Sequence, residues 1–120
     1  GAAYTLPAAA SSTIGDRIEL LYIAVLGDGE VHKYGTAGEF YSRTSYVLVP
    51  SNAANNSAYT VDVADGAADD FLNLTGATDA GWGIGTALTF IFNGTVWHVA
   101  CEGKATGAGS TAATGAFGTT

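Results

Sequence analysis

Positive charge is the scarcest feature of this sequence. Among 120 residues only 4 are lysine or arginine, against 11 aspartate or glutamate, and the formal net charge is −7. Proteins that bind nucleic acid neutralise phosphates with clustered lysine and arginine side chains, and anionic membrane surfaces attract similar clusters. The four cations are scattered from position 17 to position 104, so we expect neither nucleic acid nor a membrane as partner.

Cysteine and long apolar runs are also scarce. The single cysteine, Cys101, excludes an internal disulfide, and its place at the end of an apolar run predicts a buried structural thiol. No apolar stretch approaches the roughly 18 residues that cross a membrane as a helix. No basic segment followed by an apolar one marks a secretion signal. We therefore expect a soluble chain without a signal peptide.

Charged helix-forming side chains are too few to cover the solvent faces of a helical bundle, because charged residues make up only 12% of the chain. Glycine, alanine and threonine, by contrast, make up almost half of it. Hydrophobic residues still amount to 48% and gather in runs, which disordered low-complexity chains do not show. The length fits one domain of about 100–200 residues.

Seven apolar runs predict short strands, each bounded by turn-forming residues: 17–26, 30–34, 45–49, 59–63, 71–74, 86–92 and 95–101. Their number and spacing predict an all-β fold, a single antiparallel β-sandwich or barrel. In the run 59–63 the odd positions are apolar, so Val61 and Val63 should face the core. In the run 86–92, Leu88, Phe90 and Phe92 should share one buried face.

Two turns predict hairpins. Asp28-Gly29 joins the runs 17–26 and 30–34, and Asn93-Gly94 joins 86–92 and 95–101, because both dipeptides tolerate the positive φ of a type I′ turn. The continuous apolar residues toward the end of 17–26 predict a strand covered on both faces. Gly81, Gly83 and Gly85 lack the spacing of a phosphate-binding loop and predict a sharp bend or a close backbone approach.

The two ends differ in composition from the middle. Residues 1–13 contain Pro7, which excludes a central strand and predicts an extended N-terminal arm. Residues 103–120 contain Phe117 as their only large apolar residue, which predicts a flexible or partner-ordered tail. The β-sandwich or barrel domain should therefore occupy residues 14–102.

No constellation of residues predicts catalysis. His32 and His98 lie in expected strands, and the chain has no Gly-x-Ser-x-Gly motif. The acidic residues 62–70 offer carboxylates for a glycosidase or for Ca²⁺, but their spacing does not match a calcium loop, and a solvated loop is the simpler interpretation. Zinc would need His98 and Cys101 together, which a strand places on opposite faces. We predict no catalytic residue, no metal and no cofactor.

Three segments resemble a known family. They are Tyr4-Thr5-Leu6-Pro7-Ala8-Ala9-Ala10, Gly15-Asp16-Arg17-Ile18 and Phe92-Asn93-Gly94-Thr95-Val96-Trp97-His98-Val99. Together they resemble head decoration, or cement, proteins of tailed bacteriophages, and they are similar to β-modules of phage fibres. The resemblance implies a homotrimer on the outer surface of the virion capsid that binds the major capsid protein and bridges capsomers. It implies no enzymatic activity.

End segments without a core of their own gain order by pairing with another chain. We therefore expect capsid contacts at Ala2, Tyr4 and Leu6, and subunit contacts at Trp82, Ile84 and Phe117. The alternative hypothesis is a fibre-tip or lectin-like domain that binds host surface glycans. In that case exposed rings near polar loops would stack on sugars, with Tyr41, Tyr59 and Trp82 as the candidates.

Overall fold

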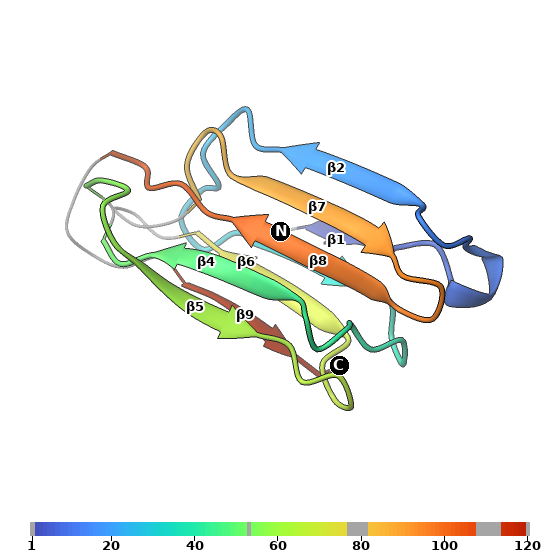
Figure 1. Ribbon diagram of the computed structural model, residues 1–120. Helices are drawn as coiled ribbons and strands as arrows, with labels where there is room; N and C mark the ends of the chain where they lie inside the picture. Colours follow the sequence, from blue (N-terminus) through green and yellow to red (C-terminus); the bar gives the residue numbers. More distant parts are fainter. Residues whose placement is uncertain (1, 53, 77–81, 108–113, 120) are drawn as a thin grey trace.

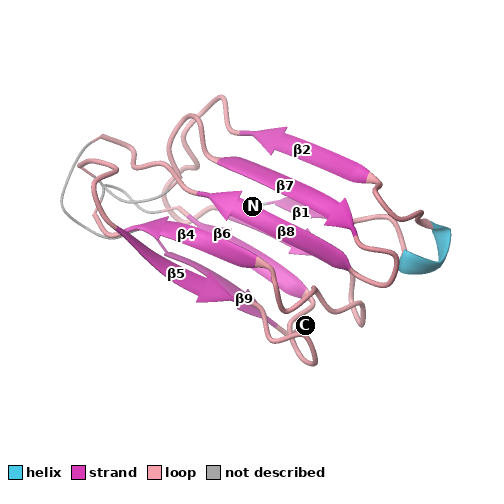
Figure 2. Ribbon diagram, in the orientation of Figure 1, coloured by secondary structure: helices cyan, strands magenta, loops and turns pink. Residues whose placement is uncertain are grey.

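The computed structural model describes residues 2–52, 54–76, 82–107 and 114–119. In this part of the chain nine strands form two sheets that pack face to face (Figure 1), and the only helix is the 3-10 turn η1 (Ala9–Ser11) (Figure 2). None of its helical structure is long and apolar enough to cross a membrane. The strands are β1 (Ala2–Tyr4), β2 (Arg17–Leu21), β3 (Val31–Gly35), β4 (Tyr46–Pro50), β5 (Tyr59–Val63), β6 (Phe71–Thr75), β7 (Ala87–Phe92), β8 (Trp97–Glu102) and β9 (Thr114–Gly118).

The two sheets are open. One has four strands in the order β1-β3-β6-β9, and the other has five in the order β2-β7-β8-β4-β5. Neither closes on itself within the described residues, so the all-β sandwich is confirmed and the barrel is not formed. Most neighbouring strands are antiparallel, but β1 with β3 and β4 with β8 are parallel. Parallel neighbours need a crossover connection, which local turn signals do not reveal.

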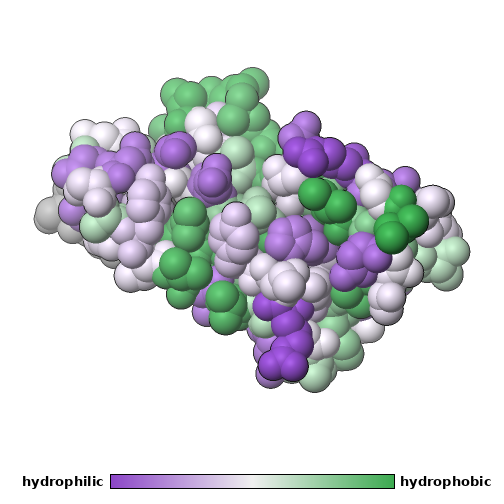
Figure 3. Space-filling model, viewed as in Figure 1, coloured by the Kyte–Doolittle hydropathy of each residue, from purple (hydrophilic) through white to green (hydrophobic). Residues whose placement is uncertain are grey.

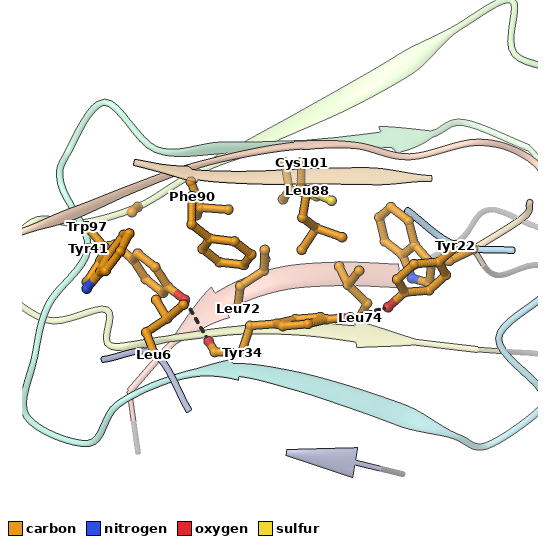
Figure 4. Packing of buried hydrophobic residues seen from close by; sticks show 14 of the residues in the cluster. Leu6, Tyr22, Tyr34, Tyr41, Leu72, Leu74, Leu88, Phe90, Trp97 and Cys101 are labelled. Carbon is orange, nitrogen blue, oxygen red and sulfur yellow. Dashed lines mark hydrogen bonds between the residues drawn. The ribbon is translucent and has the colours of Figure 1, made fainter. Parts of the chain in front are cut away.

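Apolar side chains from both sheets interdigitate in the core (Figure 4). Leu88, Phe90 and Phe92 of β7 are at most 2% exposed, which confirms the predicted face. Leu72 and Leu74 of β6 lie against them from the other sheet and have no exposed surface. Period-two alternation in β7 therefore determines which side chains enter the core.

The Trp82 indole fills the core between two glycines. The ring has no exposed surface, and a β-carbon at Gly103 or at Gly115 would overlap it. The predicted close approach is confirmed at Gly83, where a β-carbon would overlap a backbone carbonyl of the segment after β8. Gly81 lies outside the described residues. The glycines of this region make room for a large ring and for a neighbouring backbone.

The β7–β8 hairpin forms, but its turn differs from the predicted one. Phe92 pairs with Trp97, so four residues separate the strands instead of two. The Asn93 side-chain oxygen accepts hydrogen bonds from the backbone N–H groups of Thr95 and Val96, both at 2.9 Å. Gly94 alone adopts the positive φ, at 102°. Asn93 thus acts through its side chain, as asparagine often does in turns.

The hairpin predicted at Asp28-Gly29 is wrong. A turn does form there, and the N–H of Glu30 donates to the carbonyl of Gly27 at 3.1 Å. However, β2 lies in the five-stranded sheet and β3 in the four-stranded sheet. The connection between β2 and β3 therefore carries the chain from one sheet to the other, and within it the N–H of Leu26 donates to the carbonyl of Trp82 at 3.0 Å. A tight turn reverses the chain locally but does not determine which sheet receives the next strand.

The extended arms expected at the two ends are not confirmed. β1 pairs with β3 and β9 pairs with β6, so both ends of the chain supply edge strands of one sheet. Leu6 is 9% exposed and belongs to the core, and the carbonyl of Pro7 accepts a hydrogen bond from the indole of Trp97 at 3.0 Å. Residues 108–113 of the expected tail lie outside the described residues.

The predicted orientation of β5 is also wrong. Val61 and Val63 are each 60% exposed and point away from the core. Asp62 points toward the other sheet instead, where its carboxylate accepts the N–H of Phe117 at 2.9 Å. The side chains of β5 do alternate with a period of two, as predicted. The Asp62 contact between the sheets, however, turns the valine side chains outward instead of inward.

Candidate functional site

Large aliphatic side chains gather where the chain leaves β2. Leu21, Ile23 and Val25 are 62%, 82% and 49% exposed, and Ile84 is 65% exposed. We call these four residues the apolar ridge. In Figure 3 apolar side chains cluster over the connection that follows β2. The ridge is a contiguous apolar surface, and surfaces of this kind mark interaction sites on soluble proteins.

Backbone hydrogen bonds hold the ridge in place. The N–H of Tyr22 donates to the carbonyl of Thr86, and the N–H of Gly85 donates to the carbonyl of Tyr22, both at 2.8 Å. Tyr22 and Leu26 are buried, so the residues between and before them are turned outward. The buried side chains of the run 20–26 therefore anchor the segment, and its exposed side chains form the apolar surface.

A groove of about 360 Å³ lies beside residues 20–26, and Leu21, Ile23 and Val25 of the apolar ridge form part of its wall. We call it the tyrosine groove. Its walls come from the end of β2 and the following segment, from β1 and from β3, and its residues are Tyr4, Glu30, His32, Tyr34 and those at positions 20–26. The groove thus opens at the side of the sandwich where β1 and β2 are the edge strands.

The groove has an ordered aromatic wall. The Tyr22 hydroxyl lies 2.8 Å from Nδ1 of His32 and 2.8 Å from the hydroxyl of Tyr34 (Figure 4 shows the pair of tyrosines). The ring of Tyr4 stacks on that of Tyr34, with 4.8 Å between centroids and 13° between planes. Hydrogen bonding and stacking fix the rings before anything binds, which lowers the entropic cost of binding.

Burial keeps this wall uncharged near neutral pH. Burial raises the pKa of Tyr34 to about 12, and burial together with the hydrogen bond to Tyr34 raises the pKa of Tyr22 further. Burial lowers the pKa of His32, although the nearby Glu30 charge opposes the change. The rings therefore offer neutral surfaces, which suit an apolar occupant better than proton transfer.

A second apolar surface lies at the opposite margin of the five-stranded sheet. Val61 and Val63 of β5 stand opposite Leu48 and Tyr46 of β4 on the outer face. The valines are well exposed and the β4 pair is half-buried. We call these four residues the β5 face. Since β2 and β5 are the two edge strands of one sheet, the chain has separate apolar surfaces at both margins.

The structure divides the predicted contact residues into three groups. Tyr4, 42% exposed, lines the tyrosine groove, and Ile84 belongs to the apolar ridge, so these two flank residues 22–26. Ala2 is half-buried in β1. The remaining three belong to the core or pack against it: Leu6, Trp82 and Phe117.

Two of the three rings considered for glycan binding are inaccessible. Tyr41 is 2% exposed and Trp82 is fully buried, whereas Tyr59 is half-buried in β5. The Tyr41 hydroxyl donates to the backbone carbonyl of Tyr34 at 2.9 Å inside the core. A sugar ring cannot stack on side chains that have no exposed face.

The acidic residues near 62–70 bond to backbone amides. Asp65 Oδ1 accepts the N–H of Ala67 at 2.9 Å, and Asp69 Oδ2 accepts the N–H of Asp65 at 2.8 Å. Asp70 Oδ2 accepts the N–H of Gly38 at 2.8 Å. Among the described residues no three histidine, cysteine or acidic side chains gather as metal ligands do. These carboxylates organise the loop before β6.

His98 and Cys101 lie on opposite faces of β8, as predicted. His98 Nδ1 lies 2.8 Å from the hydroxyl of Thr44 on the outer face. Cys101 has no exposed surface, and burial raises its thiol pKa far above the ordinary value. A buried neutral thiol is a poor nucleophile.

The sequence did not identify the apolar ridge or the β5 face. Its apolar runs predict burial on one or both faces, and nothing in the periodicity distinguishes an exposed valine from a buried one. Comparison with known proteins adds no assignment, since no protein-family profile, curated protein or solved structure significantly matches the chain. The surfaces of the chain itself carry the functional argument.

Proposed function

We propose that the chain is a structural protein of a bacteriophage virion. It binds the outer capsid surface as a homotrimer and stabilises the head by bridging capsomers. The observation that carries the proposal is the pair of separate apolar surfaces at the two margins of one rigid sheet. A bridging protein needs one surface for its own copies and another for its support. The resemblance of three sequence segments to head decoration proteins supports the same function.

In this proposal the β5 face contacts the capsid. Burying apolar surface contributes about 25 cal/mol per Å², and the two valines offer such surface without any rearrangement. The contact of one copy is small. Three copies held together bind neighbouring capsomers with a high effective concentration, so weak contacts add up to firm attachment. The capsid contact therefore moves from the N-terminal residues Ala2, Tyr4 and Leu6 to Val61 and Val63.

The test is binding to expanded, undecorated heads of the phage that encodes the chain. We expect the wild-type protein to sediment with the heads and to raise the temperature at which they disassemble. The double variant Val61→Asp/Val63→Asp should lose both effects, because two carboxylates would be desolvated at the contact. Ile14→Asp is the matched control, since Ile14 is 72% exposed elsewhere. Heads that bind neither wild type nor control contradict the proposal.

A further inference from the structure

We propose that the tyrosine groove of one copy receives the Ile84 side of the apolar ridge of the next copy, so that identical copies join head to tail around a ring. This inference rests on the homotrimer of the proposed function and names the contact that builds it. Two surfaces carry it: Ile84, which projects from the loop before β7, and the hollow groove, whose wall includes the other three residues of the ridge.

The shapes of the two surfaces match. Ile84 projects from the loop before β7 with 65% of its surface exposed. The groove is a hollow of about 360 Å³ with apolar walls from residues 20–26 and a fixed ring at Tyr34. A single aliphatic side chain with its flanking backbone is small enough to enter such a hollow. Side chains of this kind in a preformed pocket are typical anchors of protein interfaces.

The charges beside the two surfaces are opposite. On the Ile84 side, the Lys104 side chain runs over Gly85, where a β-carbon would lie 3.6 Å from its Cγ. On the groove side, the exposed Glu30 forms part of the wall. Within the described residues neither of the two charges forms a salt bridge. Placing Ile84 of one copy in the groove of the next brings Lys104 toward the neighbour's Glu30.

This local complementarity is what a second copy requires. Each copy carries a net charge of −7, so copies repel one another wherever their surfaces are acidic. The ridge is uncharged, and one of the chain's four cations stands at its margin. A different acidic partner would also be repelled by Glu30, but it would have no cation placed opposite this carboxylate.

The arrangement predicts the symmetry of the assembly. A contact between two different surfaces is heterologous, and it generates a closed ring when the rotation between copies allows it. Ile84 and the groove both adjoin residues 22–26, so this segment lies at the contact between copies.

The first experiment measures the mass of the full chain in solution by sedimentation velocity and light scattering. Wild type should have three times the chain mass of 12.1 kDa. Ile84→Asp should be monomeric. Glu30→Lys and Lys104→Glu should each raise the dissociation constant at least about tenfold, because like charges then face each other, and the double swap should restore the trimer. Ile14→Asp should remain trimeric.

The second experiment tests the head-to-tail geometry by disulfide formation. Tyr4→Cys and Ile84→Cys in one chain should give covalent dimers and trimers under oxidising conditions, while neither single variant should. The native Cys101 does not interfere because it is fully buried. Covalent dimers of Ile84→Cys alone would show a two-fold contact and overturn the inference. A monomeric wild type, or a double charge swap that stays dissociated, would also overturn it.

The two proposals fail in different ways. A wild-type trimer that ignores expanded heads contradicts the capsid function and leaves the ring intact. A monomer that still binds heads through Val61 and Val63 contradicts the ring and the homotrimer but leaves the capsid contact of the β5 face intact. The variants of the two tests change different surfaces, because the β5 face and the apolar ridge lie at opposite margins of the five-stranded sheet.

Discussion

The Asp62 carboxylate accepts a hydrogen bond from the backbone N–H of Phe117, with 2.9 Å between Oδ2 and N. The bond joins β5, an edge strand of the five-stranded sheet, to β9, an edge strand of the other sheet. Because side chains alternate along a strand, holding Asp62 inward turns Val61 and Val63 outward. This polar contact therefore ties the two edge strands together and leaves Val61 and Val63 on the outer face.

Asp62→Ala should lower the free energy of unfolding by about 1–3 kcal/mol, since it removes a charged acceptor from a partly buried N–H. Urea denaturation measures the change. Asp62→Asn should lose less, because the amide oxygen still accepts the bond. Thr60→Ala, at an exposed position of the same strand, is the control. Equal stability of the two alanine variants would show that the contact does not hold β5.

Leu6→Ala should lower the free energy of unfolding by about 2–5 kcal/mol, as expected when a core side chain is truncated. Tyr4 lies two residues away in β1 and is 42% exposed. Tyr4→Ala should therefore lower the free energy of unfolding only by the roughly 0.5–1.5 kcal/mol of the ring stacking on Tyr34. Thermal and urea unfolding of both variants provide the comparison. If Leu6→Ala unfolds like wild type, the N-terminal segment is a free arm in solution.

Gly115→Ala should lower the free energy of unfolding by about 1–3 kcal/mol, because the added methyl group overlaps the Trp82 indole and the core must shift. Gly118→Ala is a matched control in the same strand, where a β-carbon would meet only Asn73 Nδ2 at 3.9 Å. Denaturation midpoints and Trp fluorescence should separate the two variants. Equal midpoints would contradict the packing of Trp82 against β9.

Stability should fall as the pH rises from about 10 to about 12. An unfolded tyrosine loses its proton near its ordinary pKa of 10.0, whereas burial raises the pKa of Tyr34 to about 12. In this window the unfolded state binds fewer protons, so the free energy of unfolding decreases with pH. Urea unfolding across the window measures the slope, and Tyr34→Phe should reduce it. A constant free energy of unfolding up to pH 12 would contradict the buried hydroxyl.

The sequence alone determined where seven of the nine described strands lie and which side chains of β7 enter the core, whereas β1 and β9 lie in the segments predicted to be an arm and a tail. Alternation of Leu88, Phe90 and Phe92 acts within one strand, and the Asn93-Gly94 turn acts over four residues. Burial of Cys101 and its separation from His98 also follow from the period of a strand. Such features need only neighbours in the chain, so local physics is sufficient to predict them.

Only the tertiary structure decided how the strands are shared between the sheets. The Asp28-Gly29 turn forms as expected, yet β3 joins the sheet opposite β2, where it pairs with β1 on one side and with β6 on the other. Pairing with β3 and β6 likewise takes both ends of the chain into the four-stranded sheet. The tertiary arrangement also exposes the apolar ridge and the β5 face. These outcomes depend on contacts between residues far apart in sequence, whose free energies no local pattern records.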